Sequence, residues 1–142
     1  MPSFYPRVTV LTGLLLAVSA CGGDSPSAPD TSQRFSVRYD VDGSFGGCSV
    51  FYINRRDDVA PDQENQGGTS LSDSVSLPWT HDFDVTVTQL HPFVTQIGAV
   101  CSAQASGTVN VSVTVDGQQV DSDSDTGQVA NAQAGKELTV TP

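Results

Sequence analysis

The sequence predicts an all-β domain, an antiparallel β-sandwich of about seven or eight short strands, on three observations. Apolar and polar residues alternate with a period of two in several segments. Turn-forming Gly, Pro, Asn and Asp residues separate these segments. The period of an amphipathic helix is missing, apart from room for one short helical turn at residues 129–134. A closed β-barrel stays open as the alternative, since periodicity does not separate the two architectures.

Four strands are expected in the first half of the domain. They span residues 35–42, 48–53, 71–79 and 81–90. The first alternates strictly, which is typical of a strand with one buried face. The second is apolar at nearly every position, which favours a central strand. Pro78 marks the third as an edge strand or a strand end.

The second half of the domain carries the clearest strand pattern. Residues 96–103 are short and apolar, and four valines at every second position of residues 108–115 share one face. Asp116-Gly117 then predicts a tight hairpin, with residues 118–121 returning antiparallel. A last strand is expected at residues 136–141.

Two polar segments between these strands are candidate binding loops. Residues 54–70 form a long polar connection, and long loops often carry binding sites. Residues 121–127 (DSDSDTG) place carboxylates at alternate positions, where they can converge on calcium. The EF-hand pattern needs Gly and Glu where Thr126 and Ala132 stand. A solvated acidic loop is therefore favoured, with a looser calcium site as the alternative.

The first 20 residues have the pattern of a secretory signal peptide, with Arg7 followed by a short apolar run. Val18-Ser19-Ala20-Cys21 looks like a bacterial lipobox, so Cys21 is the expected lipid-attachment residue. Residues 21–32 are rich in Gly, Ser, Pro and Asp and are expected to form a flexible tether. The folded domain then spans residues 33–142, lipid-anchored in the cell envelope and facing the periplasm or the cell surface.

Cys48 and Cys101 remain as a pair once Cys21 carries lipid. An even pair in an exported domain predicts a disulfide bond, which we expect to bridge two sheets. Closing a loop of that length is worth about 4 kcal/mol in the chain-entropy description.

Charge and composition limit the functional classes. Without Arg7, five of the six Arg and Lys residues remain against sixteen Asp and Glu, so the domain is expected to repel nucleic acid. No nucleophile motif of the Gly-x-Ser-x-Gly type is present. The two histidines, His81 and His91, lack cysteine partners for zinc. We therefore expect no enzyme activity, no catalytic residues, no metal and no cofactor. Trp79 is expected in the core, with a contact role as the alternative.

Three segments resemble the soluble domain of the MmpS family, small membrane proteins that accompany RND-type exporters. The segments are residues 37–43 (VRYDVDG), 77–80 (LPWT) and 111–120 (VSVTVDGQQV), with the alanine-rich residues 99–105 before the last. The resemblance implies an immunoglobulin-like β-sandwich and an envelope partner such as an RND-type transporter. That family is usually held by a transmembrane helix, whereas this chain carries the lipobox pattern.

Two functional hypotheses follow. The first is a lipid-anchored, non-enzymatic interaction domain of the cell envelope, an accessory to a membrane transport complex that contacts the membrane through Cys21. The alternative is an extracytoplasmic module that binds a ligand, a glycan or calcium through the two polar segments.

Overall fold

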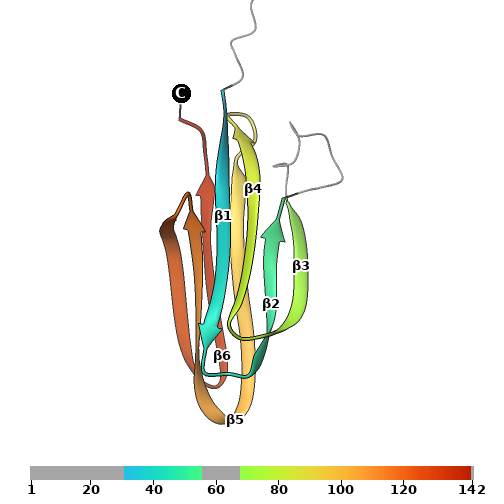
Figure 1. Cartoon of the computed structure of the whole chain (residues 1–142), viewed down its shortest axis with the longest axis vertical. Coiled ribbons are helices and arrows are strands. Elements are labelled where there is room, and N and C mark those ends of the chain that lie inside the picture. The colour runs from blue at the N-terminus through green and yellow to red at the C-terminus, as the bar shows by residue number, and fades with distance from the viewer. Residues whose placement is uncertain (1–30, 56–67, 142) are drawn as a thin grey trace, which may run out of the picture.

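Antiparallel β-strands make up the described part of the chain, which in this computed structural model covers residues 31–55 and 68–141. Six strands follow one another, and none of the described residues is helical. They are β1 (Ser32–Gly43), β2 (Gly47–Asn54), β3 (Thr69–Ser76), β4 (Trp79–Thr88), β5 (Phe93–Val115) and β6 (Gln118–Leu138). The sheet has the order β3-β2-β5-β1-β4, and β6 pairs with β5 (Figure 1). The all-β class and the antiparallel pairing are confirmed.

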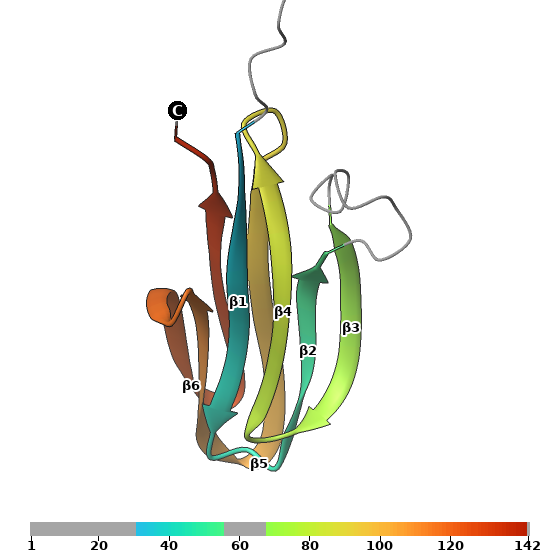
Figure 2. The same ribbon diagram turned by 45° about the horizontal axis from the view of Figure 1, so that its top comes forward.

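The two long strands, β5 and β6, shape the molecule. The first half of β5 pairs with β2 and its second half pairs with β1, while β6 pairs with both halves. The register shifts between Ser102 and Gly107, where the hairpin bends. The sheet therefore curls into an open half-barrel, and in Figure 2 β1 and β4 lie in front of β5.

The strand count differs from the expected seven or eight because adjacent segments merge. β5 joins the strands expected at 96–103 and 108–115. β6 begins at the returning strand, runs through the acidic segment 121–127 and the expected helical turn, and ends at Leu138. The loop and helical-turn predictions for these segments are wrong. Pairing with β5 stabilises an extended backbone there, whatever the local turn propensity.

The short connections at Pro78 and at Asp116-Gly117 agree with the turn signals of the sequence better than the strand count does. β3 ends at Ser76, and a cis Leu77–Pro78 peptide leads to Trp79, which begins β4 instead of closing the previous strand. Asp116 and Gly117 both have positive φ, 50° and 79°, as the predicted tight hairpin requires. The Asp116 N–H donates to the Ser36 carbonyl at 2.9 Å, which ties this turn to β1.

The core is formed by the inward rows of the alternating strands. Valine is its most frequent residue, with buried aromatic residues from β1, β2 and β5 and alanines in the last arm of β6. Tyr39 is fully buried, and its hydroxyl donates to the Ile53 carbonyl at 2.8 Å and accepts the Gln96 N–H at 3.2 Å. Burial raises the pKa of Tyr39, so the neutral phenol connects β1 with β2 and β5.

Candidate functional site

The disulfide bond between Cys48 and Cys101 is present. The two residues are direct register partners on β2 and β5, with Cα atoms 4.3 Å apart. That distance is typical of a non-hydrogen-bonded antiparallel pair. The bond therefore joins neighbouring strands of one sheet, and the expectation that it bridges two sheets is wrong. β2 pairs with β3 on its other side, which confirms β2 as an interior strand.

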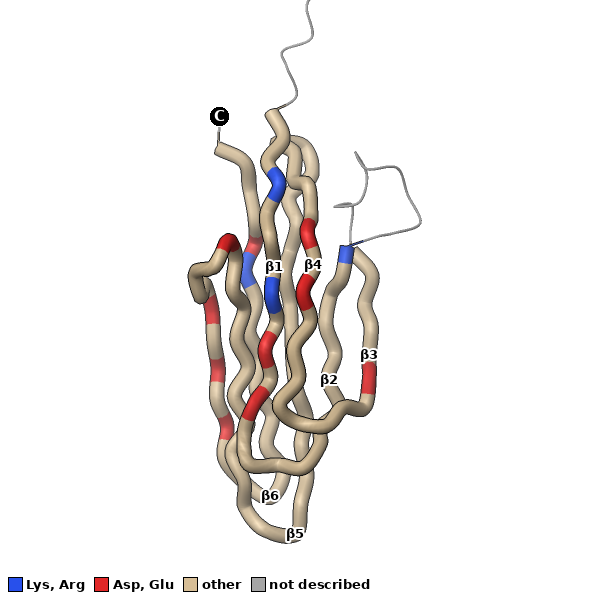
Figure 3. The backbone as a smooth tube through the Cα atoms, in the orientation of Figure 1, with Lys and Arg blue, Asp and Glu red and all other residues tan. Residues whose placement is uncertain are grey.

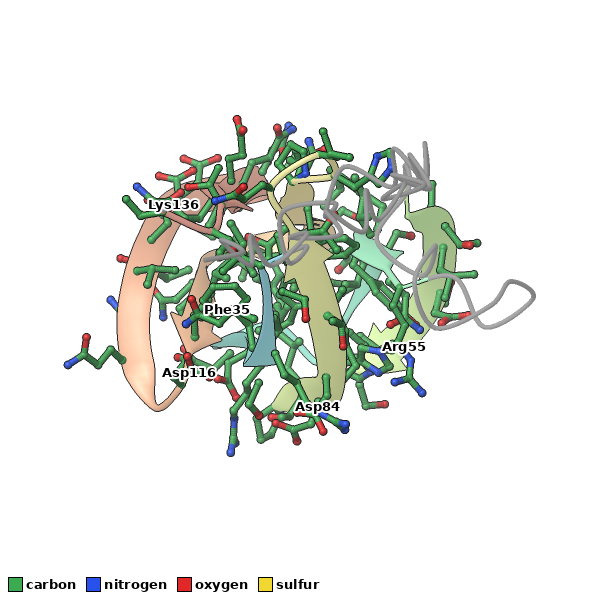
Figure 4. All side chains as sticks on the ribbon, turned by 90° about the horizontal axis from the view of Figure 1, so that it is seen from above. Phe35, Arg55, Asp84, Asp116 and Lys136 are labelled. Carbon is green, nitrogen blue, oxygen red and sulfur yellow. A yellow bond between two sulfur atoms is a disulfide. The ribbon has the colours of Figure 1, made fainter. Side chains whose placement is uncertain are left out.

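β3 and β4 are the two terminal strands of the sheet order, and β4 is the longer of them. It pairs with β1 through ten unbroken register pairs, and among the described residues no strand pairs with its other side. Arg55 Nη1 donates to the Asp84 carbonyl at 3.1 Å, and Figure 4 shows the two residues on the same side of the molecule. The Asp84 carbonyl therefore points away from β1, as do the backbone groups of Asp82 and Thr86, which have the same parity.

Half-buried aromatic side chains lie on the inward face of β4. Trp79 and His81 have ring planes only 9° apart with centroids 6.0 Å apart. Tyr52 of β2 approaches both, at 5.2 Å from Trp79 and 4.8 Å from His81. Phe83 continues the row to Phe93 of β5, at 5.9 Å. Trp79 is thus packed against the core and is also partly exposed. This position lies between the two alternatives of the sequence analysis, a core residue and a contact residue.

His81 is the ionisable residue of this aromatic cluster. Its Nε2 atom is buried and has no hydrogen-bond partner in the described structure. Burial lowers the pKa of His81, and the nearby charges of Asp82 and Asp73 oppose that shift. The imidazole is therefore neutral at pH 7 and acts as an aromatic packing group. Tyr52 donates a hydrogen bond to Asp73 at 3.3 Å, and burial raises the pKa of this phenol.

The carboxylates of the acidic segment bind the backbone of the same strand. β6 runs down one arm and returns along a second, and the Asp125 carboxylate accepts the Asn131 N–H at 2.7 Å. Asp123 accepts the Gln133 N–H at 3.0 Å, and Asp121 accepts the Gly135 N–H at 2.8 Å. We call these three contacts the carboxylate ladder. The Asn131 and Thr126 amides lower the pKa of Asp125, as expected for an ionised carboxylate with N–H donors.

The ladder bears on the calcium hypothesis. A cation needs carboxylate oxygens that converge on one point. These carboxylates are instead spread along the strand, each facing a different amide. Across residues 31–55 and 68–141 no group of three or more His, Cys, Asp or Glu residues is arranged to hold a metal ion.

A polar hollow of about 460 Å³ lies on the outer face of β1, β5 and β6. The Asn110 side-chain amide donates to Asp42 at 2.7 Å and accepts the Ser124 hydroxyl at 2.7 Å. Ser112 and Ser122 add short hydroxyls to the lining, which also includes Gln119 and Asp123. This surface offers donors and acceptors already fixed by one another, a suitable arrangement for a polar ligand.

Several residues singled out in the sequence lie outside the described structure. These are the expected signal peptide and lipobox, including Cys21, and residues 56–67 of the long polar connection. His91 lies in the turn after β4, where its N–H donates to the Thr88 carbonyl at 3.2 Å. Sequence reasoning missed the β4 edge and the carboxylate ladder, although the period-two spacing of the aspartates was a strand signal.

No protein-family model matches the chain, and no curated protein sequence matches it. Within the described ranges there is no helix with the length and apolar character needed to cross a membrane.

Proposed function

We propose that this protein is a lipid-anchored, non-enzymatic interaction domain of the bacterial cell envelope and an accessory to a membrane transport complex. The observation that carries the proposal is the edge of β4, with which no strand of the described residues pairs, together with its half-buried aromatic row. An exposed strand edge offers unpaired backbone groups, and proteins recognise extended segments by adding them as a further strand. The aromatic row then supplies the apolar contacts for the side chains of the added strand.

The anchoring part of the proposal rests on Val18-Ser19-Ala20-Cys21, the lipobox pattern. The disulfide between Cys48 and Cys101 agrees with it, because such bonds persist in oxidising compartments outside the cytoplasm. We further propose that the curled sheet is an immunoglobulin-like sandwich of the MmpS type. The support is that the bent β5–β6 hairpin is shared between a β4-β1 layer and a β3-β2 layer.

Lipid attachment is tested in cells of an expression host that supports lipoprotein processing. Wild-type protein is expected to incorporate radiolabelled palmitate and to sediment with membranes. Cys21→Ala is expected to lose the label and to leave the membrane fraction. A Cys21→Ala protein that stays labelled would overturn the anchoring proposal.

Strand addition is tested with Thr86→Pro. The Thr86 N–H points away from β1, so proline removes a donor from the open edge and leaves the β1 hydrogen bonds intact. Thr86→Val is the matched control, because it changes the side chain and keeps the N–H. Membrane-extracted wild type and Thr86→Val are expected to co-purify with the same partner, and Thr86→Pro is expected to lose it. Equal recovery with all three proteins would refute strand addition at β4.

The second candidate function is binding of a glycan or another polar ligand at the hollow of Asp42, Asn110 and Ser124. The mutually hydrogen-bonded side chains of that hollow favour it. Screening against immobilised oligosaccharides is the test, with Asn110→Ala as the disabling variant. Binding that survives Asn110→Ala, or no binding to any glycan, would count against this function.

A further inference from the structure

The carboxylate ladder caps the outer edge of the second arm of β6 with side chains from the first arm of the same strand. The second arm of β6 pairs with the first half of β5, so the N–H groups of Asn131, Gln133 and Gly135 face away from β5. Each of them donates to an aspartate of the first arm. Figure 3 shows acidic residues at regular intervals along that arm. The side chains of one arm thus occupy the donors that an added strand would use.

The edge beneath the ladder is chemically suited to a second copy of itself. Residues 129–135 (VANAQAG) carry no charge and no proline, and Val129 is 68% exposed. Antiparallel pairing centred on Gln133 sets Asn131 opposite Gly135 of the other copy, so that residues 131–135 meet only small or neutral side chains, while Val129 and Ala130 face Glu137 and Lys136. The same pairing of two β4 edges around Phe83 sets Asp82 opposite Asp84, where like charges repel.

We propose that the carboxylate ladder is an acid-sensitive latch that keeps the β6 edge closed, and that its protonation lets residues 129–135 pair with a second copy of the chain. Ionised carboxylates bind N–H groups about twice as strongly as neutral acceptors do. They also place three negative charges along the edge, which repel the same edge of another molecule. Protonation removes both effects together.

Few other charged groups face the ladder. β5, the strand packed against both arms, carries no ionisable side chain apart from the disulfide-bonded Cys101. Lys136 and Glu137 of the second arm line a hollow with Asp121, and Asp42 of β1 lines another with Asp123. The folded-state pKa of Asp125 is lowered, so its stabilisation is present above the pKa of the unfolded chain, about 3.9. It is lost as the pH falls through the lower folded value.

The test uses the full chain in detergent and two readouts. Hydrogen exchange, corrected for intrinsic rates, follows the amides of residues 131, 133 and 135, and sedimentation velocity follows the oligomeric state. Between pH 7 and about pH 3, wild type is expected to lose about tenfold in amide protection and to pass from monomer to dimer. Unchanged protection and a monomer at pH 3 would overturn the proposal.

Three variants separate the latch from general acid effects. D121N/D123N/D125N removes the three negative charges as protonation does, so it is expected to be unprotected and dimeric at both pH values. D121A/D123A/D125A is expected to dimerise already at pH 7. If this triple variant fails to fold, Asp125→Ala takes its place and is expected to give a smaller fraction of dimer at pH 7. Gln133→Pro removes a central donor of the edge. An acid dimer that survives Gln133→Pro would show that another surface pairs, and would refute the proposal.

Discussion

Replacing Cys48 and Cys101 together with alanine is expected to lower the free energy of unfolding by about 4 kcal/mol. The bond closes a loop with a sequence separation of 53, and β3 and β4 lie inside that loop. Without it, the unfolded chain regains the entropy that the loop removes. The added cavity is small because only the two sulfur atoms are lost. For a domain of this size, the melting temperature is expected to fall on the order of 15 °C.

Guanidinium titration with tryptophan fluorescence measures the effect. Trp79 is the single tryptophan and its ring lies 5.2 Å from Tyr52 of β2, so its emission reports on the strands that the disulfide joins. S49A/V100A is the matched control, because this pair is the next register pair of the same two strands and has no covalent link. The control is expected to stay within about 1 kcal/mol of wild type. An alanine pair at 48 and 101 that also stays within that range would refute the reasoning.

Three further predictions concern the core, a turn and the aromatic cluster. Tyr39→Phe removes the hydroxyl that connects β1 with β2 and β5, and the polar groups left unpaired are expected to cost about 1–3 kcal/mol in chemical denaturation. Gly43 has φ of 147°, and a Cβ there would collide with the Thr108 carbonyl, so Gly43→Ala is expected to lower the melting temperature sharply, whereas Gly46→Ala is expected to be nearly neutral. Because the pKa of His81 is lowered in the folded state, stability is expected to fall as the pH drops below about 6.5, where the unfolded chain binds the proton first. His81→Phe should flatten that part of the melting-temperature profile.

The strands with one buried face could be predicted because burial alternates along them as hydrophobicity does. β1 buries Phe35, Val37, Tyr39 and Val41, which are the residues that share one face in the sequence. Residues 103–107 and 121–127 gave the opposite result. They contain Gly, Ser and Asp, which favour turns locally, yet both segments lie in extended strands. Residues 121–127 pair with β5, whereas residues 103–106 lie at the register shift of the long hairpin, between its paired halves. A short sequence segment does not reveal which distant strand it pairs with. The sequence therefore predicts seven or eight strands, whereas the described residues form six.

The disulfide shows the same limit on a smaller scale. Cysteine count and compartment predict that Cys48 pairs with Cys101, but they do not contain the register of β2 against β5. The aspartates of the acidic segment are a second example, because the local sequence does not determine what they contact. Their spacing fits a cation loop or a strand equally well, and only the return of β6 beside itself brings each carboxylate to an amide.

The edges of the sheet differ in a way that decides where a partner strand adds. At neutral pH three ionised carboxylates occupy the outward N–H groups of the last arm of β6. At the edge of β4 the Arg55 guanidinium donates to the Asp84 carbonyl, and no strand of the described residues pairs with the neighbouring backbone donors. Among the described residues, an incoming strand displaces the Arg55 contact at β4 and the three aspartate contacts at β6, so β4 is the favoured edge while the carboxylate ladder is intact. Once acid opens the ladder, the order reverses for a second copy of the chain. Thr86→Pro and Gln133→Pro therefore act on different complexes, and each variant should leave the other's association unchanged.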